Sequence, residues 1–199
     1  MIHQMLIGRR SIPLTAVSFN AATFNGSAQT ASVASVTPSG ATYSSPTPTQ
    51  TNAGTYSTSI TGTGAYSDTV SANWTINAKS VTFSYSPTSF TYNGAAQGPT
   101  VTPSDGSTTY SNGGTTSATN AGSYTISSTA NGNYTGSGSS SWSISAKSVT
   151  FSYSNTSFTY DGASHSPTVT PSDGSATYSN GGTTSATNAG SYTITSTAS

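Results

Sequence analysis

The sequence repeats itself with a period of 68 residues, and no other feature constrains its fold as strongly. Residues 78–131 reappear as residues 146–199, and 46 of the 54 aligned positions carry the same amino acid. A more diverged first copy keeps the same register at fixed points, because Phe24-Asn25-Gly26 aligns with Tyr92-Asn93-Gly94 and Trp74 aligns with Trp142. A chain built this way is an array of small, similar units.

The repeat boundaries divide the chain into four segments. We expect an N-terminal segment over residues 1–14, followed by repeats over residues 15–77, 78–145 and 146–199. The third repeat reaches only the position that matches Asn131, so it is expected to lack the last strand of its sandwich and to expose a sheet edge. Either the natural chain continues beyond Ser199, which we favour, or a neighbouring chain donates that strand.

Apolar residues alternate with Ser and Thr inside each repeat. Val81, Phe83 and Tyr85 fall on one face, as do Trp142 and Ile144, and this period of two is typical of half-buried β-strands. Between the strands stand dipeptides that favour turns, namely Asn93-Gly94, Asp105-Gly106, Asn112-Gly113 and Asn131-Gly132. The pattern predicts an all-β fold of tandem small immunoglobulin-like antiparallel β-sandwiches.

Two further positions recur in each sandwich. The run Thr-Asn-Ala-Gly-Ser-Tyr-Thr-Ile at residues 119–126 looks like a tyrosine corner, in which a Tyr bonds the backbone of the preceding turn. This predicts a structural role for Tyr56, Tyr124 and Tyr192. The strand that follows carries Trp74 or Trp142, and we expect both indoles in the core.

Composition excludes several classes of function. Ser and Thr supply 81 residues, whereas charged residues make up 4 % of the chain and the net charge is zero. Nucleic-acid binding needs clustered Lys and Arg side chains, which this chain lacks, so we expect no binding of DNA or RNA. The chain has no Cys or Glu, and its four Asp residues are scattered. We therefore expect no metal, no cofactor and no enzymatic activity.

A few side chains are still candidates for a catalytic, metal-binding or covalent role. His165 replaces Gln97 of the second repeat, so a catalytic or metal-binding role would be new to one copy, and we interpret it as a surface loop residue. Asp161 and Asp173 precede Gly and are interpreted as turn formers. Lys79 and Lys147 recur at the repeat junctions, where an isopeptide bond to Asn is one possibility and a junction hydrogen bond is the favoured one.

Exposed aromatic residues offer one candidate for ligand contact. Tyr110 and Tyr178 each precede Ser-Asn-Gly-Gly, so a sugar ring stacked on the Tyr would have amide groups beside it. Packing in the core or across strands is the commoner role of such residues. We carry both as candidate glycan contacts from predicted loops.

Several of these motifs resemble a known family. Phe-Thr-Tyr-Asp-Gly at residues 158–162, Pro-Thr-Val-Thr-Pro at 167–171 and Thr-Asn-Ala-Gly-Ser-Tyr-Thr-Ile at 187–194 resemble the MBG-type immunoglobulin-like repeats of bacterial surface proteins. The resemblance implies a stalk, adhesion or carbohydrate-contact role. Immunoglobulin-like repeats are also similar to accessory domains of tailed-phage virion proteins. Such motifs specify the fold better than the function.

The N-terminal segment differs from the repeats in composition. It gathers apolar residues and half of the positive charge in a candidate assembly anchor, formed by Met1, Ile2, Met5, Leu6, Ile7, Arg9 and Arg10. The segment does not read as a secretory signal, and no run is long enough to span a membrane. We therefore expect a non-enzymatic component of a virion surface that docks to other structural proteins through this segment, with a bacterial surface stalk or adhesin as the alternative.

Overall fold

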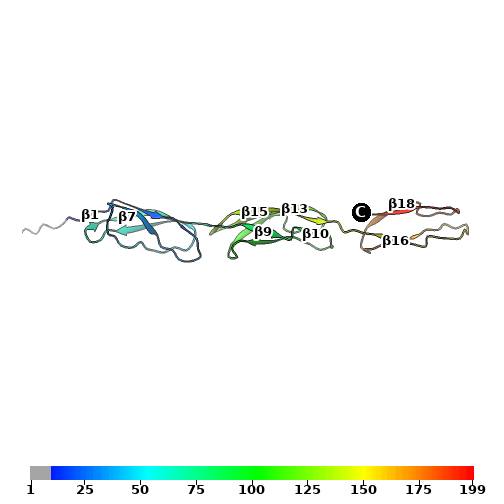
Figure 1. The fold of residues 1–199 in the computed structure, drawn as a ribbon, viewed down its shortest axis with the longest axis horizontal. Coiled ribbons are helices and arrows are strands. Elements are labelled where there is room, and N and C mark those ends of the chain that lie inside the picture. Colours follow the sequence, from blue (N-terminus) through cyan, green and yellow to red (C-terminus); the bar gives the residue numbers. More distant parts are fainter. Residues whose placement is uncertain (1–9) are drawn as a thin grey trace, which may run out of the picture. The chain divides into compact units, whose positions relative to one another are not determined.

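All regular secondary structure in the part of the chain described by the computed structural model, residues 10–199, is β-strand. The prediction of an all-β, immunoglobulin-like sandwich fold is confirmed (Figure 1). The strands fall into two compact units, one made of the described residues up to Phe90 with Gly94–Ile144, and the other of Thr91–Asn93 with Ser145–Ser199. Arg10 is exposed, and the other six candidate anchor residues lie outside the described residues.

The first repeat is a two-layer sandwich. One sheet has the order β3-β7-β5, in which β5 and β7 are antiparallel, and the pair β2-β4 forms the opposing layer. A short parallel pair, β1-β6, closes one end. The strands are β1 (Ile12–Pro13), β2 (Ala16–Asn20), β3 (Ala22–Thr23), β4 (Ser32–Thr37), β5 (Gly54–Thr61), β6 (Tyr66–Ser67) and β7 (Thr69–Asn77).

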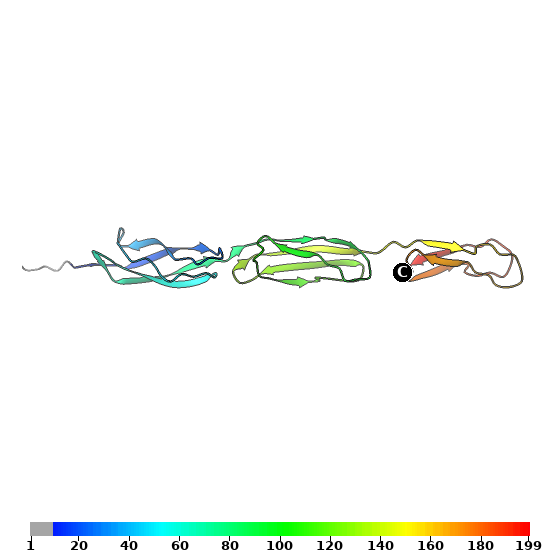
Figure 2. The same ribbon diagram turned by 90° about the horizontal axis from the view of Figure 1, so that it is seen from below.

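The second repeat has the same arrangement, but its larger sheet has four strands instead of three. Its order is β10-β15-β13-β12, and the long strands β13 and β15 run side by side (Figure 2). The pair β9-β11 lies in the opposing layer, and β8 pairs in parallel with β14. The strands are β8 (Lys79–Ser80), β9 (Phe83–Ser86), β10 (Ser89–Thr91), β11 (Thr100–Pro103), β12 (Tyr110–Gly114), β13 (Gly122–Ala130), β14 (Tyr134–Thr135) and β15 (Ser137–Ser145).

The third repeat contains two antiparallel pairs. β16 (Phe151–Ser154) pairs with β17 (Thr168–Pro171), and β18 (Tyr178–Gly182) pairs with β19 (Ile194–Ala198). These pairs repeat the β9-β11 and β12-β13 pairs of the second repeat with the same residue register. The described residues provide no strand in the place of β15.

Alternation along the strands accounts for the core. In β13 and β15 the inward positions carry Ile126, Trp142 and Ile144, each no more than 2 % exposed, while the Ser and Thr between them face outward. Half-buried Phe90 and Tyr124 pack against this cluster. Trp74 and Ile76 form the matching cluster of the first repeat.

Two details differ from the sequence predictions. The first repeat begins before residue 15, because β1 pairs with β6 and the side chain of Leu14 is buried in the core. Asn112-Gly113 is not a turn but lies inside β12. The reason is a buried bond, since Ser128 is 1 % exposed and its hydroxyl donates to the Asn112 side-chain oxygen at 2.7 Å.

Candidate functional sites

Each repeat holds its tyrosine corner by one hydrogen bond. The hydroxyls of Tyr56, Tyr124 and Tyr192 donate to the backbone carbonyl four residues earlier, at distances of 2.7, 2.7 and 2.8 Å. The ring of Tyr124 lies 4.7 Å from that of Trp142, whose indole N–H donates to the carbonyl of Thr115 at 3.0 Å. These bonds fix the turn before β13 against the core of the sandwich.

The junction between the first and second repeats is the first candidate site. A single residue, Ala78, separates the end of β7 from the start of β8. The carbonyl of Asn77 accepts from the backbone N–H of Phe24 at 2.8 Å, and the backbone N–H of Lys79 donates to the backbone carbonyl of Asn133 at 2.9 Å. Both sides of the joint are therefore held by the repeat to which they belong.

Direct contacts across this junction connect the two repeats within one compact unit. The side-chain oxygen of Asn133 accepts from the N–H of Ala53 at 2.7 Å, and its amide nitrogen donates to the side chain of Asn52 at 3.1 Å. Beside these bonds the ring of Phe24 meets that of Tyr134 edge-on, with a centroid separation of 5.4 Å. Tyr134 is only 9 % exposed, so the contact is largely shielded from water.

An ion pair stands at the same end of the second repeat. The amine of Lys79 lies 2.7 Å from a carboxylate oxygen of Asp105. The other carboxylate oxygen accepts from the backbone N–H of Ser107 at 2.9 Å. The Lys79 bond, followed by the Ser107 bond, lowers the pKa of Asp105, and the carboxylate raises the pKa of Lys79.

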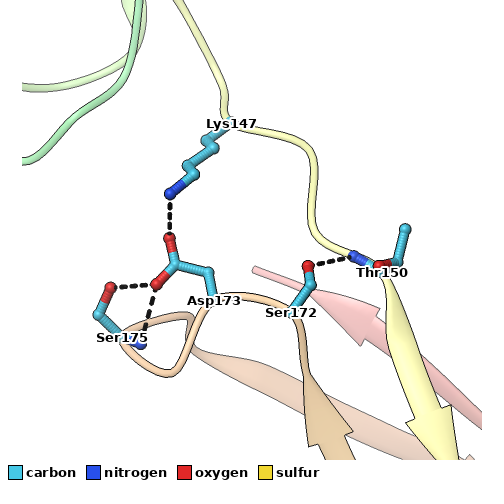
Figure 3. Close-up of polar contacts among 5 residues, drawn as sticks. All are labelled: Lys147, Thr150, Ser172, Asp173 and Ser175. Atoms are coloured by element: carbon cyan, nitrogen blue, oxygen red, sulfur yellow. Dashed lines mark hydrogen bonds and ion pairs between the residues drawn. The ribbon is translucent and has the colours of Figure 1, made fainter.

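The third repeat contains the same ion pair (Figure 3). The amine of Lys147 lies 2.7 Å from one carboxylate oxygen of Asp173, and the other carboxylate oxygen accepts from both the hydroxyl and the N–H of Ser175. The bond from Lys147 and those from Ser175 lower the pKa of Asp173. Next to the pair, the N–H of Thr150 donates to the hydroxyl of Ser172. Both lysines thus face aspartates, and Asp173 is an ion-pair partner as well as a turn former.

His165 is bound to its own loop. Its ring nitrogen lies 2.8 Å from Asp161, and its ring stacks on Phe158 at a centroid distance of 4.6 Å. The N–H of Ala163 and then His165 lower the pKa of Asp161. The first repeat makes the same contact with uncharged residues, since Gln29 donates to Asn25 at 3.1 Å. His165 therefore continues a structural bond of the repeat.

The two candidate glycan-contact residues lie in strands instead of loops. Tyr110 begins β12, and its ring is 5.4 Å from that of Phe83. Tyr178 begins β18, is 36 % exposed and packs 5.2 Å from Phe151. The alternation of the strand places each ring beside a Phe of the opposing layer, which leaves only part of it open to a ligand.

A groove in the third repeat is the second candidate site. Its volume is about 490 Å³, and it runs between residues 156–160 and 183–194. The wall includes Phe158, which is 47 % exposed, and Tyr192, which is 51 % exposed. Tyr192 keeps its tyrosine-corner bond to Asn188, but in the described residues no strand covers either ring.

Neither site has the composition of a metal centre. Among residues 10–199, no group of three or more His, Cys, Asp or Glu side chains lies close enough to hold a metal ion. The same residues contain no helix of the length and apolarity needed to cross a membrane.

Fold and repeat order define the class of the chain, which is an array of small immunoglobulin-like β-sandwiches. The family model of the MBG domain matches residues 79–148, a span that coincides closely with the second repeat. The third repeat, with 46 of 54 aligned residues identical to the second, shares its strand pairs and ion pair. No curated protein and no solved structure matches the chain.

Proposed function

We propose that the chain is a non-enzymatic structural protein whose MBG-type repeats form a stiff spacer. The observation that carries this proposal is the junction between the first two repeats. Its linker is one residue long, and Asn133 and Tyr134 of the second repeat make direct contacts with the first repeat. A long Gly- and Ser-rich linker would let neighbouring repeats turn independently, whereas this joint restrains them.

The polar groups of the chain support a structural role. Both lysines are engaged with aspartates, and His165 is engaged with Asp161. Buried Ser128 is bonded to Asn112 inside a sheet. These groups stabilise turns and strands, which is the use expected in a spacer.

The stiffness of the junction can be measured by single-molecule energy transfer. Because the chain has no Cys, Ser39→Cys and Ser139→Cys would place one dye on an exposed position of each of the first two repeats. We expect a narrow distance distribution. Inserting Gly-Ser-Gly-Ser-Gly after Ala78 should broaden it, while the same insertion after Gly94, whose surroundings are open, should not. Equal widths for the native and linker-extended chains would refute the spacer.

The location of the spacer is a finer proposal. We place it on a virion surface, with a bacterial cell surface as the alternative, and propose that residues 1–10 dock it to other structural proteins there. The chain has only four Lys and Arg residues, so it offers few cleavage sites to trypsin-like proteases. This composition supports a location outside a cell. Mass spectrometry of purified particles and of cell envelopes separates the two locations. Deletion of residues 1–10 should abolish incorporation, and unchanged incorporation would exclude the anchor.

Weak glycan contact at Tyr110 and Tyr178 remains part of this proposal. Tyr178 is the better candidate, because more than a third of its surface is open. Titration of surface oligosaccharides followed by NMR should shift the Tyr178 ring signals, and Tyr178→Ala should remove the binding. Shifts that persist in this variant would assign the contact elsewhere.

A further inference from the structure

The groove of the third repeat is best understood from the second repeat, where the same place is filled. There β15 lies between β10 and β13, with Tyr124 opposite Trp142 in the register. Trp142 packs edge-on against Phe90 at 5.8 Å and against Tyr124 at 4.7 Å. Its indole N–H is satisfied by the carbonyl of Thr115. One strand thus supplies a side chain that three separate segments hold.

The third repeat retains the groups that hold that side chain. The 68-residue period aligns Phe158 with Phe90, Tyr192 with Tyr124, and Thr183 with Thr115. All three line the same groove of about 490 Å³. A groove of this volume, walled by two aromatic rings and a carbonyl-bearing backbone, suits a large aromatic side chain with one hydrogen-bond donor.

The backbone beside the groove is also prepared for a strand. β13 spans nine residues from Gly122 to Ala130, but β19 spans only Ile194–Ala198. Residues 190–193, which align with the start of β13, form no ladder in the described chain, and neither do residues 157–159, which align with β10. Backbone outside any ladder, beside a groove that exposes two aromatic rings, is a place where an added strand can bind.

We propose that this groove binds an extended polypeptide strand with the sequence pattern of β15, antiparallel to β19. The occupant carries Trp and Ile two residues apart on one face and small polar residues on the other, as Ser137–Ser145 does. Its Trp ring lies between Phe158 and Tyr192, and the indole N–H donates to the carbonyl of Thr183. Its Ile lies opposite Gly190, as Ile144 lies opposite Gly122 in the second repeat. The choice of occupant rests on β15, which is the strand that fills the equivalent slot in this same molecule.

The test uses a synthetic peptide of residues 133–147, labelled with a fluorophore and titrated with the full chain. We expect saturable one-to-one binding by anisotropy. Hydrogen exchange should slow at residues 190–193 in the complex, because their N–H groups join a ladder. Replacing Trp by Ala in the peptide should weaken binding about tenfold or more, because buried aromatic anchors dominate such contacts.

Variants of the chain localise the binding. Phe158→Ala, at a half-exposed position, should weaken peptide binding, whereas Tyr153→Ala, which removes an exposed aromatic ring outside the groove, should leave it unchanged. If Phe158→Ala fails to fold, the Trp→Ala peptide still tests the same pocket. No binding of the native peptide, equal binding of the Trp→Ala peptide, or self-association of the chain that buries the groove and excludes the peptide would each overturn the proposal.

Discussion

At the scale of single residues, the repeats keep contacts while changing the residues that make them. Asn25 and Gln29 bond in the first repeat, and Asp161 and His165 bond at the same positions in the third. The sequence placed His165 in a loop and Asp161 in a turn but did not join them. The signal that links them is that both positions change together between repeats. Similarly, the identical Lys–Asp spacing in two repeats is the sequence sign of the ion pairs.

The tyrosine corner makes a prediction at this scale. Tyr124→Phe removes the bond to Asn120 and should lower the free energy of unfolding of the second repeat by about 1 kcal/mol. Urea unfolding followed by Trp142 fluorescence, in a Trp74→Phe background, reports the unfolding transition of the second repeat. Tyr92→Phe, at a ring 40 % exposed, is the control and should be neutral. Equal effects of the two substitutions would contradict the assignment.

The junction ion pair predicts a dependence on pH. The pKa of Asp105 is lowered by folding, so the pair stabilises the repeat above the unfolded pKa, near 4, and this contribution is lost as the pH falls through the folded pKa. The pKa of Lys79 is raised, so the same contribution is also lost at strongly alkaline pH. The effect is small, because both side chains are partly exposed.

Thermal unfolding between pH 2 and pH 6 checks this dependence. Asp105→Asn should reduce the loss of stability in acid compared with the native chain, while Asp68→Asn serves as the control for removing one carboxylate. An acid profile of Asp105→Asn that superimposes on the native profile would show that the pair contributes nothing measurable.

At the scale of elements, alternation and turn chemistry predicted the strands, because one face of each sheet is buried and the other is solvated. The sequence pattern predicted β13 and β15 for this reason. Asn112-Gly113 was misread because local turn propensity was overridden by the buried bond to Ser128. β1 escaped prediction because a two-residue strand is too short to show alternation. The groove of the third repeat required the three-dimensional alignment of distant segments.

A close contact between elements makes the next prediction. Gly136 has a φ of +134°, and a Cβ placed there would lie 2.2 Å from the carbonyl oxygen of Val81. Gly136→Ala should therefore destabilise the second repeat by about 2 kcal/mol or more, since the β8-β14 end must shift. Gly106→Ala, where the space is open, is the matched control. Similar melting temperatures for the two variants would contradict the predicted clash.

At the scale of the whole molecule, the way in which the repeats are joined decides whether they act as a spacer. The first two repeats share one compact unit through Asn133 and the Phe24–Tyr134 contact. In tandem-repeat proteins, stability is the sum of the repeat stabilities and the terms at their interfaces. The junction should thus couple the unfolding of the two repeats as well as restrain their motion.

Coupling predicts a specific effect of Asn133→Ala. The substitution removes both junction hydrogen bonds, so it should lower the unfolding midpoint of the first repeat, although Asn133 belongs to the second. Fluorescence of Trp74 in a Trp142→Phe background reports the first repeat. Asn20→Ala, on an exposed strand end of the first repeat, is the control. An unchanged Trp74 midpoint in Asn133→Ala would mean that the repeats unfold independently.

The most direct test of the stiff spacer is the rotational diffusion of its first two repeats, measured by NMR relaxation of backbone amides. We expect residues 15–77 and 78–145 to share one rotational correlation time and one diffusion axis, because the joint is one residue long and bonded on both sides. Two separate, shorter correlation times, each matching a single repeat of its size, would contradict it.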